Sequence, residues 1–226
     1  MGDWRSDGAN ASWRGVLAAD RGWALVADGM GGHEAGDVAS RIAVETISRF
    51  IGQAESPREI AAMLDTANRD LFKIMHSGDG RPGMGTTIVG ARWTEREALI
   101  FNLGDSRAYR ACPKGLTQVS LTQVSRDDTL GGHGLPGGGR SHVLTQCLGG
   151  SRTPRPLRPH IDRLPLAHDT GLLLCSDGLT DMLNDDEIAR VLAQNANDPA
   201  EQLVATALDA GGQDNVTVVM VGPAGT

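Results

Sequence analysis

The short connections between predicted strands are the feature that most limits how this chain can fold. Four strands are predicted in succession with only brief turns between them: Thr86–Trp93, Ala98–Leu103, Ala108–Arg110 and Leu116–Ser120. Parallel neighbours require a crossover of about a dozen residues or more, so strands joined this closely pair antiparallel. The middle of the chain is therefore predicted to form an antiparallel meander.

Helical patterns occur on both sides of this meander. Helices are predicted over Asp37–Phe50, from Ser56 onward, over Asn184–Asn195 and from Asp198 to Gly211. The start after Ser56 is the best marked, because Pro57 and Glu59 occupy positions that a helical first turn favours. Further strands are predicted at Trp23–Ala27, His160–Leu164, Gly171–Ser176 and Asn215–Val221. This order of elements predicts an α+β layered fold.

Size and composition limit the class of protein. The chain has 226 residues and a formal net charge of −7, and at about 150 residues per domain we expect a single domain over residues 1–226. An acidic balance argues against nucleic acid as a partner, because phosphates need a basic face. No apolar run is long enough to cross a bilayer, and residues 1–10 lack the apolar core of a secretory signal. We therefore expect a cytoplasmic protein that does not insert into membranes.

Cysteine usage agrees with that location. Cys112, Cys147 and Cys175 are widely spaced and odd in number, and they form no CxxC pair. A disulfide framework or a zinc knuckle is therefore not expected, and reduced thiols are the simpler interpretation.

Aspartates stand at the ends of several predicted strands. Asp28, Asp105 and Asp177 each follow an apolar strand, and Asp214 directly precedes the last one. If these ends converge, the carboxylates need cations to remain ionised together, and oxygen ligands without His or Cys favour Mg²⁺ or Mn²⁺. An Asp-Gly pair is also an ordinary turn dipeptide, so the pattern alone leaves both a metal site and simple turns open.

Five motifs in order give this pattern a family likeness. They are Val26–Gly36 (VADGMGGHEAG), Gly85–Thr87 (GTT), Asn102–Tyr109 (NLGDSRAY), Leu174–Asp181 (LCSDGLTD) and Asp214–Thr217 (DNVT). Together they resemble the bacterial metal-dependent protein phosphatases of the PP2C (PPM) family. The resemblance implies a four-layer α-β-β-α sandwich, in which two antiparallel sheets are flanked by helix pairs. It also implies hydrolysis of phosphoserine and phosphothreonine in proteins by a hydroxide that bridges two metal ions.

The resemblance further implies a site for two Mn²⁺ or Mg²⁺ ions. Asp28 would bridge both ions, Gly29 would offer its carbonyl to one of them, and Asp177 and Asp214 would hold the other. Asp28, Asp177 and Asp214 are therefore the predicted catalytic carboxylates. Asp105 and Asp181, together with Asp177, match the positions of a third, weaker ion.

The residues around these ligands follow the family pattern less closely. His33, Asn10 and Asn215 are expected to lie near the ligands without binding the ions themselves. The family's first motif carries an arginine and an acidic residue, and here those places hold Asp7 and Ser12. Arg5 or Arg14 could take over phosphate binding from a shifted backbone.

The flap of the family is shortened here. Residues 125–130 resemble its entry and residues 141–149 its exit, and only the glycine-rich stretch Gly131–Gly139 lies between them. The shortened Gly-rich flap lies around 125–145. We expect Gly131–Gly139 within it to be mobile, because glycine has high backbone entropy and no side chain to pack.

Two interpretations of function remain at this point. The first is a monomeric phosphatase that acts on phosphoproteins and opposes a Hanks-type Ser/Thr kinase, in a type VI secretion context. The second is a pseudophosphatase, a phosphoprotein-binding module with weak turnover. Asp7 and Ser12 favour the second interpretation, whereas the intact Asp28, Asp177 and Asp214 favour the first.

Overall fold

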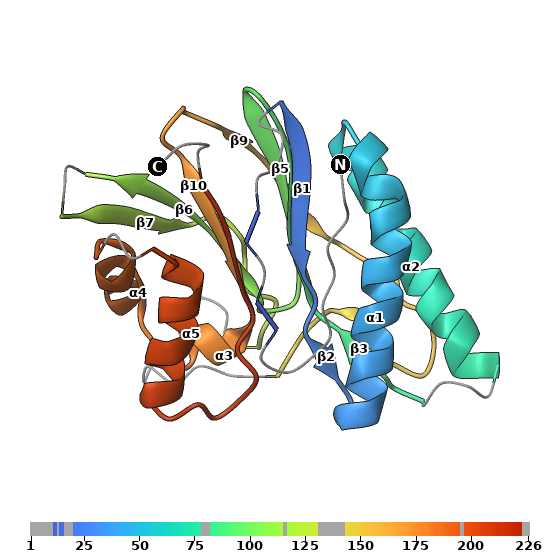
Figure 1. The fold of residues 1–226 in the computed structure, drawn as a ribbon. Helices are drawn as coiled ribbons and strands as arrows, with labels where there is room; N and C mark the ends of the chain where they lie inside the picture. Colours follow the sequence, from blue (N-terminus) through green and yellow to red (C-terminus); the bar gives the residue numbers. More distant parts are fainter. Residues whose placement is uncertain are drawn as a thin grey trace.

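Two antiparallel sheets form the centre of the fold (Figure 1). The computed structural model describes residues 11–12, 14–15, 20–77, 82–114, 117–130, 143–194 and 197–222. The first sheet has the order β1 (Arg21–Val26), β4 (Ile88–Thr94), β5 (Glu97–Leu103) and β9 (His160–Pro165). The second has the order β11 (Val218–Val221), β10 (Gly171–Cys175), β6 (Arg107–Pro113) and β7 (Val119–Gln123). All neighbouring strands pair antiparallel, as predicted.

Helices cover the outer face of each sheet (Figure 1). On the first sheet lie α1 (His33–Phe50) and α2 (Pro57–Ser77), joined through the 3₁₀ turn η1 (Ile51–Gln53). On the second lie α3 (Asp177–Thr180), α4 (Asp185–Leu192) and α5 (Pro199–Asp209). A small third sheet, of β2 (Gly29–Met30), β3 (Gly85–Thr86) and β8 (Leu148–Gly149), lies beside α1 and α2. The predicted four-layer α-β-β-α arrangement is confirmed.

The central strands are apolar on both faces because each sheet lies between two layers. On β10, Leu172 and Leu174 pack between the sheets, whereas Leu173 and Cys175 pack against the helices of the second sheet. Successive side chains of a strand point to opposite faces, so a continuous apolar run is required where both faces are covered. The run at 172–175 is therefore a direct result of the layered fold.

Helix starts follow the signals in the sequence. Ser56 Oγ accepts from the Glu59 amide at 3.3 Å, and Glu59 in turn accepts from the Glu55 amide at 2.9 Å. At the start of α4 the pair is fully reciprocal: Asn184 Oδ1 accepts from the Glu187 amide at 3.0 Å, and Glu187 Oε2 accepts from the Asn184 amide at 2.8 Å. Such caps satisfy amide groups that have no partner within the helix.

Several predicted boundaries were wrong. The strand predicted over Thr86–Trp93 is broken at Thr87, and the strand predicted over Leu116–Ser120 runs instead over Val119–Gln123. The last strand begins at Val218 rather than Asn215, and α1 begins at His33 rather than Asp37. Thr87 and Asn215 leave the sheets because their backbones bind other motifs, as described below.

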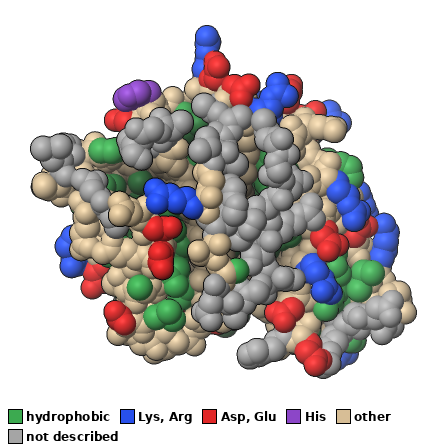
Figure 2. Space-filling view, viewed as in Figure 1, with side chains coloured by type: hydrophobic (Ala, Val, Ile, Leu, Met, Phe, Trp, Pro, Cys, Tyr) green, Lys and Arg blue, Asp and Glu red, His purple; other side chains and the backbone are tan. Residues whose placement is uncertain are grey.

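Other sequence expectations meet the structure in part. All three cysteines are free. Among the described ranges, no helix is both long and apolar enough to span a bilayer. The stretch Gly131–Gly139 lies outside the described residues. Figure 2 shows basic and acidic side chains interspersed over one face of the molecule.

Replacing Leu174 should weaken the contact between the sheets. Leu174 is fully buried there, so Leu174→Ala is expected to lower the free energy of unfolding by about 2–5 kcal/mol, measured by urea titration. Leu208→Ala is the control, because Leu208 is 53% exposed and its loss should change stability by less than about 0.5 kcal/mol. Equal losses in the two variants would contradict this packing.

Candidate functional site

The predicted carboxylates come from loops at the ends of the central strands. Asp28 follows β1, and Asp105 lies in the turn by which the chain passes from β5 in one sheet to β6 in the other. Asp177 follows β10 as the first residue of α3, and Asp214 stands ahead of β11. Both sheets therefore contribute to the same group of acidic residues.

Charge repulsion shows that the four carboxylates lie near one another. The pKa of Asp28 is raised to about 8. Burial is the largest cause, followed by the charge of Asp177 and a hydrogen bond to it, and then by the charges of Asp214 and Asp105. The pKa of Asp105 is raised to about 6, chiefly by burial and then by Asp177. Each charged form is therefore costly unless something positive offsets the neighbouring charges.

Two threonines fix the backbone of Asp28. Its carbonyl accepts hydrogen bonds from the Thr87 amide at 2.8 Å and from Thr86 Oγ1 at 2.9 Å. Its amide donates to Thr87 Oγ1 at 3.2 Å. Thr87 Oγ1 also lies 2.7 Å from Ser106 Oγ, next to Asp105. Three of the sequence motifs are thus joined by one buried hydrogen-bond network.

A second network joins the other two motifs. The Ser176 hydroxyl donates to the Asn215 carbonyl at 3.3 Å and accepts from the Thr217 amide at 3.0 Å. Gly178 packs so closely that a Cβ there would lie 2.3 Å from the Asn215 carbonyl oxygen. These contacts hold the segment that carries Asp214 against the segment that carries Asp177, and they explain why Asn215 is not in the strand.

Gly29 is held close to the first turn of α1. It pairs with Thr86 across the small sheet, and a Cβ on Gly36 would lie 2.6 Å from the Gly29 carbonyl oxygen. Glycine at both positions is therefore required for this contact.

The donor set suits a hard cation. Oδ1 of Asp177 is buried and has no hydrogen-bond partner, which is unusual for a carboxylate oxygen. Oxygen donors alone favour Mg²⁺ or Mn²⁺, and Mg²⁺ commonly keeps several waters and takes only one or two carboxylates. In the described part of the chain, no group of three or more His, Cys, Asp or Glu side chains is arranged to hold a metal ion. The residues present therefore fit a divalent ion whose coordination is completed by water or substrate oxygens.

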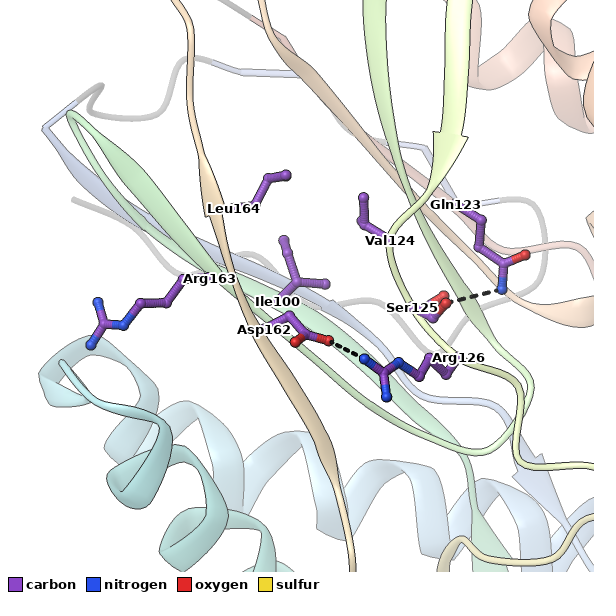
Figure 3. A pocket seen from close by; sticks show the side chains of 8 residues that line it. All are labelled: Ile100, Gln123, Val124, Ser125, Arg126, Asp162, Arg163 and Leu164. Atoms are coloured by element: carbon purple, nitrogen blue, oxygen red, sulfur yellow. Dashed lines mark hydrogen bonds and ion pairs between the residues drawn. The ribbon is translucent and has the colours of Figure 1, made fainter.

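A hollow lined by described residues lies elsewhere (Figure 3). It measures about 390 Å³ and opens between β9 and the segment that follows β7, with Ile100 and Leu164 among its apolar lining. Arg126 and Asp162 form an ion pair there at 3.7 Å, but both are more than half exposed, so the pair stabilises the fold little. None of the clustered carboxylates lines this hollow.

Some predicted site residues cannot be placed. Arg5, Asp7 and Asn10 lie outside the described residues, as does the side chain of His33. Ser12 and Arg14 are exposed and belong to neither a helix nor a strand. Asp181 is exposed at the end of α3, and its charge contributes to the raised pKa of Asp105.

Sequence analysis assigned no role to Thr86, Thr87 or Ser106, although all three lie in the motifs quoted above. Their small hydroxyl side chains beside strand-end carboxylates were the available signal. Asp127 was also missed: it contributes to the raised pKa of Asp105 and accepts hydrogen bonds from Arg107 Nε at 3.0 Å.

Comparison with known proteins decides the family. A model of protein phosphatase 2C matches residues 12–210. The chain belongs to the protein phosphatase 2C family. It is 30% identical over 219 residues to the serine/threonine phosphatase Stp of Listeria monocytogenes, covering 87% of this chain and 82% of that protein. The family membership and such relatives identify a protein-serine/threonine phosphatase, a metal-dependent phosphoric monoester hydrolase.

Solved structures agree with this assignment. The serine/threonine phosphatase of S. agalactiae matches with a TM-score of 0.78 at 27% identity, covering 91% of this chain and 88% of that one. PppA, described as a key regulatory component of the type VI secretion system in Pseudomonas aeruginosa, matches with a TM-score of 0.73 at 30% identity. That match covers 88% of this phosphatase and 85% of PppA.

Gly178→Ala should damage the phosphatase by pushing the Asn215 segment outward. The new Cβ would meet a backbone oxygen at 2.3 Å, and backbone cannot move aside as a flexible side chain does. We expect a loss of about 1–3 kcal/mol in the free energy of unfolding, with reduced phosphatase activity. Gly52→Ala is the matched control, because a Cβ at Gly52 has no heavy atom within 4 Å. Activity unchanged in both variants would contradict the role of this contact.

Proposed function

We propose that Asp28, Asp177 and Asp214 form the catalytic centre of this phosphatase and bind two Mn²⁺ or Mg²⁺ ions. The observation that carries the proposal is the raised pKa of Asp28, caused by burial and by the neighbouring Asp177 and Asp214. The unpartnered Oδ1 of Asp177 supports it further. The Gly29 carbonyl would complete the second ion's protein ligands, and Asp105 with Asp181 would hold a third, weaker ion.

The protein's part in the reaction is to hold oxygen ligands in fixed positions. When bound, such cations lower the pKa of water and neutralise the charge that grows on the phosphoryl oxygens. Thr86 and Thr87 hold Asp28 by its backbone, so the point from which its carboxylate extends is fixed. Ser176 holds the Asp214 segment in the same way through Asn215 and Thr217. A substrate phosphate would be bound in addition by Arg14 or Arg5.

The physiological setting is a finer proposal. The described elements pack around shared cores, which supports one phosphatase domain with a short flap around 125–145. The substrates would be phosphoproteins modified by a Hanks-type kinase in the cytoplasm, and the likeness to PppA supports a role in type VI secretion. We further propose that the phosphatase acts as a monomer.

Asp177→Asn should remove turnover without unfolding the protein. The variant loses an anionic ligand, so hydrolysis of p-nitrophenyl phosphate with Mn²⁺ should fall by about 100-fold or more. Without metal, its free energy of unfolding should be unchanged or higher, because one of the charges that repel Asp28 is gone.

Asp169→Asn is the matched control for that experiment. Asp169 is exposed in a turn, so its removal should leave both activity and stability unchanged. Full activity in Asp177→Asn would overturn the proposed centre. An unmutated protein that binds phosphoproteins without hydrolysing them would instead support the pseudophosphatase interpretation.

Ser12→Asp should strengthen the second metal site. Ser12 stands where the family's first motif has an acidic residue, so the second ion has one fewer negative ligand here. Each additional 1.4 kcal/mol of binding is about tenfold in affinity, and the variant should reach its half-maximal rate at lower Mn²⁺ concentration. Ser12→Asn is the control without the added charge. An unchanged Mn²⁺ dependence in Ser12→Asp would mean that another residue supplies the ligand.

A further inference from the structure

Asp128 is a buried carboxylate that receives hydrogen bonds from three separate parts of the chain. Its side chain is 8% exposed. Oδ2 accepts from the Gly104 amide at 2.9 Å, and Oδ1 accepts from Gln146 Nε2 and His160 Nε2, each at 2.9 Å. A buried carboxylate is tolerated where donors satisfy it in this way.

Asp128 forms two hydrogen bonds with Gly104. The Asp128 amide donates to the Gly104 carbonyl at 3.0 Å, so both backbone groups of Gly104 are bound by one residue. On its other side Gly104 touches Thr87, whose side chain would lie 2.7 Å from an added Cβ. Gly104 has a φ of 106°, a conformation that favours glycine. The turn that carries Asp105 is therefore held between Asp128 and the Thr87 that binds Asp28.

Asp128 also lies at the base of the flap. Thr129 forms a β-bridge with Leu144, and the Leu130 amide donates to the Val143 carbonyl at 2.9 Å. The Asp128 carbonyl accepts from the Thr145 amide at 2.7 Å. The two segments that lead into and out of the flap thus pair next to Asp128, which also holds the Gly104 turn.

Gln146 is fixed in one orientation. Its Nε2 donates to the Arg158 carbonyl at 2.9 Å, and its Oε1 accepts from the Arg158 amide at 3.2 Å. Because both ends of this amide are occupied, Gln146 cannot turn to suit a changed partner at position 128.

We propose that Asp128 is a positioning residue that holds Asp105 in place for a divalent cation and links that position to the base of the flap. The inference rests on the proposed function, in which Asp105 binds the third ion. Asp128 acts only through the Gly104 turn and is not itself a ligand. Its effect therefore depends on the carboxylate of Asp105.

Asp128→Asn tests this link. Asparagine keeps one oxygen, so it cannot accept from Gly104 and from Gln146 together. In metal-free protein, hydrogen exchange at the Gly104 amide should become faster. The half-maximal Mn²⁺ concentration for p-nitrophenyl phosphate hydrolysis should rise by about tenfold, equivalent to about 1.4 kcal/mol. The KM for the aryl phosphate should stay unchanged, because Asp128 does not touch the substrate.

A double-mutant cycle with Asp105→Asn separates positioning from general destabilisation. Once Asp105 has lost its charge, adding Asp128→Asn should cause no further change in Mn²⁺ dependence. Independent, additive effects would overturn the proposal, and so would unchanged exchange at Gly104. Asp162→Asn is the matched control, since this exposed carboxylate forms a long ion pair with Arg126 at 3.7 Å and its loss should leave all readouts unchanged.

Two further measurements keep the result interpretable. If Asp128→Asn does not fold, Gln146→Leu removes one donor to Asp128 and should shift Mn²⁺ dependence in the same direction by a smaller amount. Calorimetric titration with Mn²⁺, without substrate, should show weaker binding of one ion in either variant. If the unmutated protein does not bind Mn²⁺ at all, the proposed function is wrong. If the unmutated protein binds Mn²⁺ and the Asp128→Asn variant binds it equally well, only the role of Asp128 is wrong.

Discussion

Repulsion among clustered carboxylates, half-buried at Asp28, Asp105 and Asp177, is the interaction on which the rest of this structure depends. Strands from two different sheets bring Asp28 near Asp177, Asp214 and Asp105. Burial first, and then the charges of these neighbours, raise the pKa of Asp28 to about 8. Such a cluster is unfavourable for the folded protein, so the surrounding packing must hold it in place. The apolar core between the sheets, which includes Val26 and Leu174, supplies that support. The charge repulsion at the site is thus offset by the apolar packing between the two sheets.

Small residues make the cluster rigid. Thr87 binds Asp28 and contacts Ser106, and Ser176 plays the corresponding part beside Asp177. Gly29 and Gly178 allow backbones to approach within distances that any side chain would prevent. Oxygen ligands fixed before a cation arrives need no reorganisation during the reaction, which is how preorganised sites stabilise a developing charge.

The sequence predicted the layers well and the boundaries poorly. Antiparallel pairing followed from the short turns, and the helix starts at Ser56 and Asn184 followed from their caps. The break at Thr87 could not be foreseen, because the bond that draws it out of the strand is made to Asp28, 59 residues away in the chain. The strand at Val119–Gln123 was misplaced because its true partners lie on β6, and local propensity does not set that register.

The sequence by itself determined the family, because five motifs occur in the order typical of these phosphatases, and it predicted which oxygen ligands would form the site. Only the tertiary structure decided how those ligands are held. Nothing local distinguishes Asp128 from its neighbour Asp127, yet Asp128 binds Gly104, Gln146 and His160, whereas Asp127 pairs with Arg107. The physical reason is that hydrogen bonds and charge repulsion depend on distances in space, and those distances are set by the packing of the two sheets.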